Sequence, residues 1–192
     1  MADIFEDIIC ITNRKLVEIP FLEQIKNICS KKPYALILRE KDLKPDEYLA
    51  LAEKVKKICD EYDIEFIAHF FYEAALKLNT SYVHLPLWKY KEIKENDSIK
   101  KQVGVSVHSI EEAIEAQHLG AAYLIVGHIF KTECKKNLEP RGLDFLEKIC
   151  ESVDIPVYAI GGMKLEEKLI DEVKSKGAKK ICIMSELMRK NI

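Results

Sequence analysis

The chain is poor in the residues that interrupt or cross-link a fold, with 7 glycines, 6 prolines and 6 cysteines in 192 residues. No two cysteines form a C-x-x-C pair, so the common zinc and disulfide motifs are absent and a reduced, cytosolic protein is indicated. A surplus of one charge is also lacking, because the formal net charge is −2. This balance gives no electrostatic reason to expect binding to nucleic acid or to an anionic membrane.

Long hydrophobic runs are missing as well, and none approaches the ~20 residues that a membrane-spanning helix needs. The first residues, MADIFEDIICITNRK, carry acids ahead of a short apolar run, which is not the pattern of a signal peptide. Hydrophobic residues make up 48% of the chain and charged residues 32%, as in globular proteins. We therefore expect a cytoplasmic protein with one domain over residues 1–192.

What the sequence does contain is a regular alternation of short apolar runs with amphipathic segments. The runs are DIICIT (7–12), YALILR (34–39), IEFIAH (64–69), SYVHLP (81–86), KQVGVSVH (101–108), AAYLIVG (121–127), IPVYAI (155–160) and KKICIM (179–184). Between two of them, Ser109 and Glu112 form a capping-box pattern that predicts a helix start, and Gly120 predicts its end. Apolar strands alternating with helices predict a parallel sheet that is covered on both faces.

Eight such strand–helix units in 192 residues predict a single (β/α)8 TIM barrel. A doubly wound open sheet is the competing architecture, but no G-x-G-x-x-G motif follows the first run. In barrels of this kind, catalytic groups lie at the carboxyl ends of the strands. The polar or glycine residues at or near those ends include Arg39, Glu40, Lys41, His69, Ser106, His108, Gly127, His128, Gly161, Gly162, Ser185 and Glu186.

The Gly161-Gly162 turn and Ser185 form a candidate phosphate site. Backbone N–H groups approach an anion closely where no Cβ intervenes, and a helix N-terminus adds positive potential. The loops after strands seven and eight are where barrels frequently hold phosphate. The alternative interpretation of the two glycines is a tight turn without a ligand.

Arg39 and Lys41 form a candidate site for a second anionic group, since residues at i and i+2 along a strand point the same way. The alternative is a surface pair neutralised by Glu40 or Asp42. Separately, three histidines at strand ends could suggest zinc. No two of them have the spacing of a zinc motif, so we expect no metal.

Several stretches together resemble the thiamine phosphate synthase superfamily. They are ALILREK, YVHLP, VGVSVHSIEEA, GAAYLIVGHIFKTECKK, IPVYAIGGM and CIMSELM. This superfamily has a (β/α)8 barrel. One branch, the synthases, joins a pyrimidine diphosphate to a thiazole phosphate using magnesium. The other, the TenI-type thiazole tautomerases, converts a thiazole carboxylate phosphate to its aromatic tautomer without a metal.

The stretch GHIFKTECKKNLEPRG (127–142) resembles the tautomerase branch. Synthases have G-P-I-F-x-T-x-T-K here, whereas this chain has a histidine, a cysteine and a double lysine. Synthases also hold magnesium with an Asn-Asp pair after strand three and an aspartate past strand four. The resemblance places His69, Phe70 and Lys89 at those positions, so neither metal-binding acid is present.

The resemblance implies His128 as the general acid and base, because an imidazole both accepts and donates a proton near neutral pH. It also implies the following binding residues: Gly162, Met184 and Ser185 for phosphate; Thr132, Cys134 and Lys135 for the thiazole; Arg39, Lys41, Ser106 and His69 where synthases bind the pyrimidine diphosphate. The expected ligand is a phosphorylated thiazole, with no cofactor and with a homodimer as the candidate assembly. A divergent synthase and a non-catalytic binder of thiazole or thiamine phosphates are the alternatives.

Overall fold

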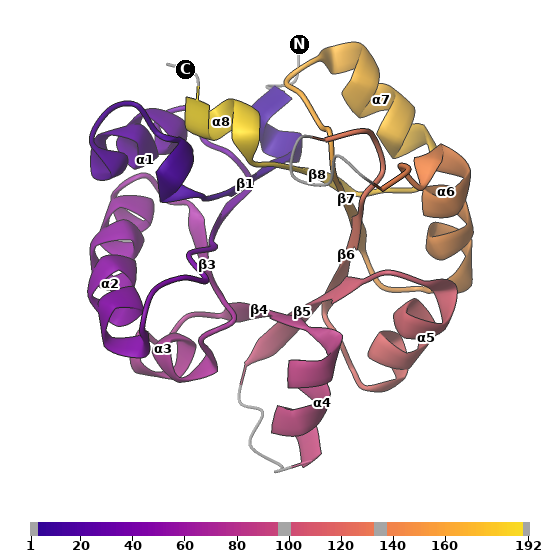
Figure 1. Ribbon diagram of the computed structural model, residues 1–192, viewed down its shortest axis with the longest axis horizontal. Helices are drawn as coiled ribbons and strands as arrows, with labels where there is room; N and C mark the ends of the chain where they lie inside the picture. Colours follow the sequence, from indigo (N-terminus) through magenta and orange to yellow (C-terminus); the bar gives the residue numbers. More distant parts are fainter. Residues whose placement is uncertain (1–3, 96–100, 133–137, 190–192) are drawn as a thin grey trace. The chain divides into compact units, whose positions relative to one another are not determined.

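The computed structural model describes residues 4–95, 101–132 and 138–189 (Figure 1). Eight strands, hydrogen-bonded to one another in sequence order, form a closed barrel, which confirms the predicted (β/α)8 fold. Each predicted apolar run contains one strand: β1 (Ile8–Ile11), β2 (Ala35–Leu38), β3 (Glu65–His69), β4 (Tyr82–Pro86), β5 (Gln102–Val107), β6 (Tyr123–Gly127), β7 (Val157–Ile160) and β8 (Lys180–Ile183).

The helices of the described residues follow the strands along the chain. They are α1 (Phe21–Cys29), α2 (Pro45–Glu61), α3 (Tyr72–Lys77), α4 (Leu87–Glu95), α5 (Ile110–His118), α6 (Gly142–Ser152), α7 (Glu167–Ser175) and α8 (Ser185–Arg189), with short 3-10 turns η1 (Ile4–Asp7) and η2 (Arg14–Leu16). None of these helices is long and apolar enough to cross a membrane.

The chain divides into two compact units, the first from Met1 to His84 with Ile183 to Ile192, the second from Leu85 to Cys182. In the first unit, β1 to β4 run parallel, with Leu36 of β2 between Cys10 of β1 and Phe66 of β3. All four residues of β1 and all four of β2 are buried. This explains why their sequences are continuously apolar and not alternating.

In the second unit, β5, β6, β7 and β8 are also parallel neighbours. The predicted start of α5 is confirmed, because the Ser109 side chain accepts a hydrogen bond of 3.1 Å from Glu112 N. The Glu112 carboxylate in turn accepts one from His108 N at 2.6 Å, which satisfies a second backbone donor at this helix start. Gly120, with φ +89°, ends the segment as predicted.

Candidate functional site

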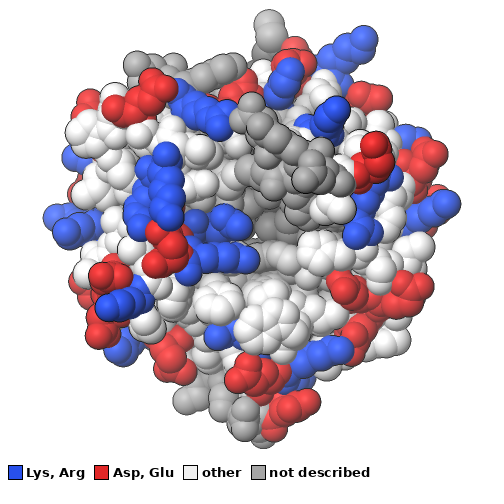
Figure 2. Space-filling model, in the orientation of Figure 1, with Lys and Arg blue, Asp and Glu red and all other residues white. Residues whose placement is uncertain are grey.

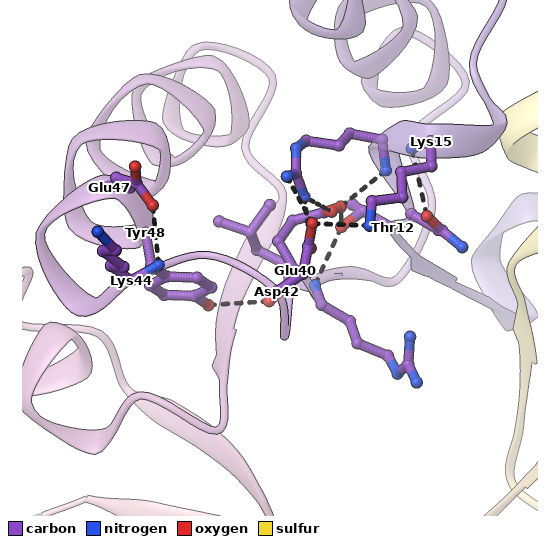
Figure 3. A network of polar contacts seen from close by, with 11 residues as sticks. Thr12, Lys15, Glu40, Asp42, Lys44, Glu47 and Tyr48 are labelled. Atoms are coloured by element: carbon purple, nitrogen blue, oxygen red, sulfur yellow. Dashed lines mark hydrogen bonds and ion pairs between the residues drawn. The ribbon is translucent and has the colours of Figure 1, made fainter.

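A buried carboxylate organises the ends of β1 and β2 (Figure 3). Glu40 is 2% exposed, and its Oε1 atom accepts hydrogen bonds from Thr12 Oγ1 at 2.7 Å and from Arg14 N at 2.9 Å. Its Oε2 atom lies 2.8 Å from Arg14 Nη1. Asp42 binds the same guanidinium at 2.7 Å and Lys15 at 2.9 Å, and these contacts lower the pKa of Asp42. Both acids therefore form their ion pairs with residues that follow β1.

This network argues against the interpretation of Arg39 and Lys41 as a surface pair neutralised by Glu40 or Asp42. Glu40 and Asp42, the acids expected to neutralise them, bind other cations, and within the described residues neither Arg39 nor Lys41 has an ion pair. The Arg39 backbone N–H donates to Thr12 Oγ1 at 3.0 Å, which ties this strand end to the network. Figure 2 shows Lys and Arg side chains gathered where Figure 1 places β1 and β3. The site carries positive charge without a partner among the described residues.

Two imidazoles lie next to these cations. His69 and His84 are paired residues of β3 and β4, and their ring centroids are 5.6 Å apart with an interplanar angle of 27°. They are 6% and 2% exposed. The Nδ1 atom of His69 is buried and accepts or donates no hydrogen bond within the described part of the chain. A buried polar atom of this kind requires an explanation, because leaving it without a partner costs free energy.

Burial and charge keep both imidazoles neutral. Burial is the largest cause of the pKa of His69 falling well below its usual value, followed by the charges of His84, Lys41 and Arg39. Burial, and then Lys41, lower the pKa of His84 to about 3. Desolvation of its ammonium group, and then the charge of Arg39, lower the pKa of Lys41, although this side chain is exposed overall. These mutual effects place Arg39, Lys41 and the two rings in one electrostatic environment.

The backbone around His69 is held by Tyr48 of α2. The Tyr48 hydroxyl donates to Leu38 O at 2.8 Å and accepts from His69 N at 2.9 Å, so it joins the ends of β2 and β3. Its ring stacks on Phe71 with centroids 4.2 Å apart. Phe70 has a positive φ of +72°, which is unfavourable for a residue with a side chain. The chain turns sharply after His69, because Phe71 N donates a hydrogen bond to His69 O at 2.9 Å.

His128 lies in the second unit, directly after β6 and 4% exposed. Its carbonyl accepts a hydrogen bond from Arg141 N at 2.8 Å, and the carbonyl of Ile129 accepts one from Gly142 N at 3.0 Å. Arg141 Nη1 also donates to the carbonyl of His108. The segment that carries His128 is therefore fixed to the start of α6.

The Gly161-Gly162 turn supports the same segment. Ile129 N donates to Ile160 O at 3.1 Å, and Phe130 N donates to Gly161 O at 2.9 Å. A Cβ on Gly161 would lie 2.9 Å from the Cα atom of His128, and one on Gly162 would lie 2.6 Å from Lys131 O. The two glycines have φ values of +111° and +69°. Close packing against residues 128–131 thus accounts for both glycines, and a phosphate there stays a prediction.

The other predicted site residues are divided between the two units. Ser106 lies in β5 opposite Ile125 of β6 in the second unit, and the described Thr132 follows β6 in the same unit. Met184 and Ser185 belong to the first unit, and Ser185 begins the five-residue helix α8. Cys134 and Lys135, predicted to line the thiazole pocket, lie outside the described residues.

Magnesium, the metal of the synthase branch, does not fit the residues at the corresponding positions. His69 is a buried neutral imidazole, Phe70 offers no donor, and the Lys89 ammonium lies 5.8 Å from the centre of the Trp88 ring. Magnesium prefers oxygen ligands, mainly carboxylates and water. Within the described residues, no group of three His, Cys, Asp or Glu side chains could hold a metal ion.

Sequence reasoning missed Thr12, Arg14 and the partnership of His84 with His69. The first strand end, ITNR, carried the same signal as the others, namely polar residues directly after an apolar run. The His69–His84 pairing had no sequence signal, because it depends on the register of β3 against β4. Tyr48 was likewise indistinguishable from the other apolar positions of α2.

Comparison with known proteins gives consistent matches over most of the chain. The family model described as thiamine monophosphate synthase matches residues 8–187. The putative thiamine-phosphate synthase 2 of Aquifex aeolicus is 35% identical over 158 residues, which cover 82% of this chain and 85% of that protein. The thiamine-phosphate synthase of Clostridium acetobutylicum is 38% identical over 156 residues, covering 79% and 72% of the two chains.

A solved structure is similar along nearly the whole chain. The thiamine phosphate pyrophosphorylase from Pyrococcus furiosus aligns with a TM-score of 0.80 at 30% identity, covering 98% of this chain and 89% of the other. These matches confirm the superfamily expected from the sequence. The names of these three relatives are those of the synthase branch, and none of the three is named a tautomerase.

Proposed function

Because the chain belongs to the thiamine monophosphate synthase family, an enzyme family of thiamine biosynthesis, we propose that it isomerises a thiazole carboxylate phosphate to its aromatic tautomer without a metal ion. One observation carries this proposal. The positions that correspond to the magnesium ligands of synthases hold His69, Phe70 and Lys89, which supply no carboxylate oxygen. A reaction that expels diphosphate gains much from a metal, whereas a proton transfer between two carbons does not require one.

His128 is the proposed acid and base. Aromatisation removes a proton from one ring carbon and delivers a proton to another, so a single imidazole can accept the first and donate the second. The position of His128 supports this role, because it follows β6 directly and its backbone is fixed by Arg141 N. A rigid strand end holds a proton-transferring group in one place through both steps.

The proposed binding residues fall into three groups. Gly162, Met184 and Ser185 would hold the phosphate; Thr132, Cys134 and Lys135 would contact the thiazole; Arg39 and Lys41 would attract a second anionic group. Support for the last group is the absence of an ion pair for either cation within the described residues. Two cations next to one another are stabilised by a bound anion.

A second candidate function is the synthase reaction itself. The names of the relatives favour it over the tautomerase, since all three proteins compared above are called thiamine-phosphate synthase or pyrophosphorylase. Arg39 and Lys41, where synthases bind the pyrimidine diphosphate, are present here. The missing carboxylates at positions 70 and 89 count against it.

The deciding experiment is a pair of assays on the same purified protein. In the first, the thiazole carboxylate phosphate is added and the absorbance of the aromatic tautomer is followed. In the second, the pyrimidine diphosphate and the thiazole phosphate are added with magnesium, and thiamine phosphate is measured. Turnover in the first assay alone supports the tautomerase. Turnover in the second alone establishes the synthase and refutes the proposal, and binding without turnover in either assay identifies a non-catalytic binder.

A further inference from the structure

The end of β3 carries an imidazole nitrogen, Nδ1 of His69, whose capacity for hydrogen bonding is unused within the described residues. This atom is buried, in a side chain that is 6% exposed, and it has no hydrogen-bond partner within the described part of the chain. A buried polar atom without a hydrogen-bond partner raises the free energy of the folded protein. Tyr48 and the strand pairing with β4 fix the backbone of His69, and its ring stacks on the ring of His84. A ligand atom that bonds to Nδ1 would remove this cost.

The surroundings of His69 determine the charge of such a ligand. Leu38 of β2 pairs with Ala68 of β3, so the residues that follow them, Arg39 and His69, stand at neighbouring strand ends. The ring of His84 stacks on His69, and the charges of Lys41 and Arg39 also lower the pKa of His69. The acids next to Arg39 and Lys41 in the sequence are bound to Arg14 and Lys15. A cation would be repelled here, whereas an anion would meet two positive charges and a neutral hydrogen-bond donor.

We propose that His69 donates a hydrogen bond from its imidazole to a carboxylate of the substrate, and that Lys41 and Arg39 neutralise this carboxylate directly in place of a metal ion. His69 is then a specificity-determining residue. The inference rests on the proposed function, because it names the group of the thiazole carboxylate phosphate that the first unit recognises. His84 acts through His69 by stacking against it, and is a positioning residue.

The number of charges favours a carboxylate over a diphosphate. Arg39 and Lys41 supply two positive charges, which exceed the single negative charge of a carboxylate. A diphosphate ester carries close to three negative charges at neutral pH and needs a further cation. In many enzymes that bind diphosphates, magnesium is this cation. Without carboxylates at positions 70 and 89, this chain has no oxygen ligands there to recruit that cation.

The test measures binding and not turnover, so that it is separate from the proposed reaction. Two probes are titrated calorimetrically in EDTA: the aromatic thiazole carboxylate phosphate, and the same thiazole phosphate lacking the carboxylate. The ratio of their dissociation constants isolates the contribution of the carboxylate. We expect the wild-type protein to bind the carboxylate probe at least about tenfold more tightly, the size of one charge-assisted hydrogen bond.

The variants His69→Leu and His69→Asn separate hydrogen bonding from packing. Leu fills the space without a donor and should abolish the preference, whereas the Asn amide places a donor close to the position of Nδ1 and should retain part of it. Affinity for the probe without the carboxylate should be unchanged in both, which also shows that the variants are folded. If His69→Leu does not fold, two other variants test the inference. Lys41→Met should lose the preference for the carboxylate probe, and His69→Asn should retain part of it.

Three results would overturn the inference. They are an equal affinity of the wild type for the two probes, including the case in which neither binds; a preference that His69→Leu keeps; and a preference that appears only when magnesium replaces EDTA. Tautomerase turnover combined with any of these would leave the proposed function standing and remove His69 from it. A His69-dependent preference in a protein without turnover would support the site and refute the reaction.

Discussion

The guanidinium of Arg14 lies 2.8 Å from the carboxylate of Glu40, so a residue that follows β1 neutralises the acid located between Arg39 and Lys41. Arg14 is partly exposed and Glu40 is buried. Hydrogen bonds that fixed donors make to a buried carboxylate are stronger than those between neutral groups. The pairing leaves the two neighbouring cations available to an anionic ligand and fixes the backbone that carries them.

We predict that Glu40→Gln lowers the free energy of unfolding by about 1–3 kcal/mol, because a buried acceptor of three hydrogen bonds loses its charge. Urea unfolding measures this change. Glu53→Gln, a substitution of an exposed acid on α2, is the control and should be neutral within ~0.5 kcal/mol. Equal stabilities of the Glu40 and Glu53 variants would show that the network contributes nothing to folding.

The acid stability of the protein should depend on His84. Its pKa is about 3 in the folded chain against an ordinary value of 6.5, so the unfolded chain binds one more proton between these values. Stability from this group is therefore complete above pH 6.5 and declines as the pH falls toward 3. Each unit of pKa shift corresponds to about 1.4 kcal/mol. The lowered pKa of His69 acts in the same direction.

The measurement is the free energy of unfolding between pH 7 and pH 4 for the wild type and for His84→Gln. We expect the variant to be less stable at pH 7 and to lose less stability on acidification, since one proton-binding group is gone. His118→Gln removes an exposed histidine of α5 and should keep the wild-type slope. An unchanged slope in His84→Gln would contradict the buried neutral state of this imidazole.

The Gly161-Gly162 turn supplies a prediction with a matched control. Gly162 and Gly142 have similar φ values of +69° and +78°. A Cβ on Gly162 would lie 2.7 Å from Phe130 Cβ, whereas one on Gly142 has nothing within 4 Å. Both Gly→Ala changes carry the backbone penalty of about 1 kcal/mol, and only Gly162→Ala adds a collision with the segment after His128.

Gly162→Ala should therefore be less stable than Gly142→Ala by about 1–3 kcal/mol in urea unfolding. It should also reduce turnover and weaken the binding of phosphorylated ligands, since the segment from His128 to Lys131 must shift. Titration with the thiazole phosphate tests the binding. If Gly162→Ala lost stability but bound this probe with unchanged affinity, the phosphate site would lie elsewhere and the glycine would serve packing alone.

Restoring the missing acids is a stricter test of the magnesium argument. The double variant Phe70→Asp with Lys89→Asp replaces an apolar and a cationic side chain with two carboxylates, the ligands that magnesium prefers. Calorimetry should detect magnesium binding in the variant and not in the wild type. Thiamine phosphate formation should stay low, because His128 and Cys134 also differ from the synthase pattern. Wild-type magnesium binding at a specific site would contradict the argument.

The strands could be predicted because burial on both faces leaves a continuous apolar run, as in β1 and β2. The start of α5 could be predicted because the Ser109 cap is a local interaction. The partner of Glu40 could not be predicted in this way. Glu40 and Arg14 are 26 residues apart, and nothing local distinguishes Arg14 from Lys41 as the cation that the carboxylate selects.

Some candidate site residues could be chosen from the sequence, whereas the contacts between them could not. Position at a strand end selected Arg39, Lys41, His69 and His128 as candidates, because catalytic groups of such barrels lie at the carboxyl ends of the strands. The stacking of His69 on His84 follows from strand register, and the pKa values follow from burial, neither of which a sequence states. The roles of the glycines in packing likewise emerged only from the distances around residues 128–131.

The most direct test of metal-free proton transfer by His128 is the rate of aromatisation by protein dialysed against EDTA, for the wild type and for His128→Asn in the same buffer. The account predicts full wild-type turnover that added magnesium does not raise. It predicts a loss of about 10²-fold or more in the variant, the usual contribution of a general acid–base group. A wild-type rate that requires magnesium, or an equal rate in His128→Asn, would contradict it.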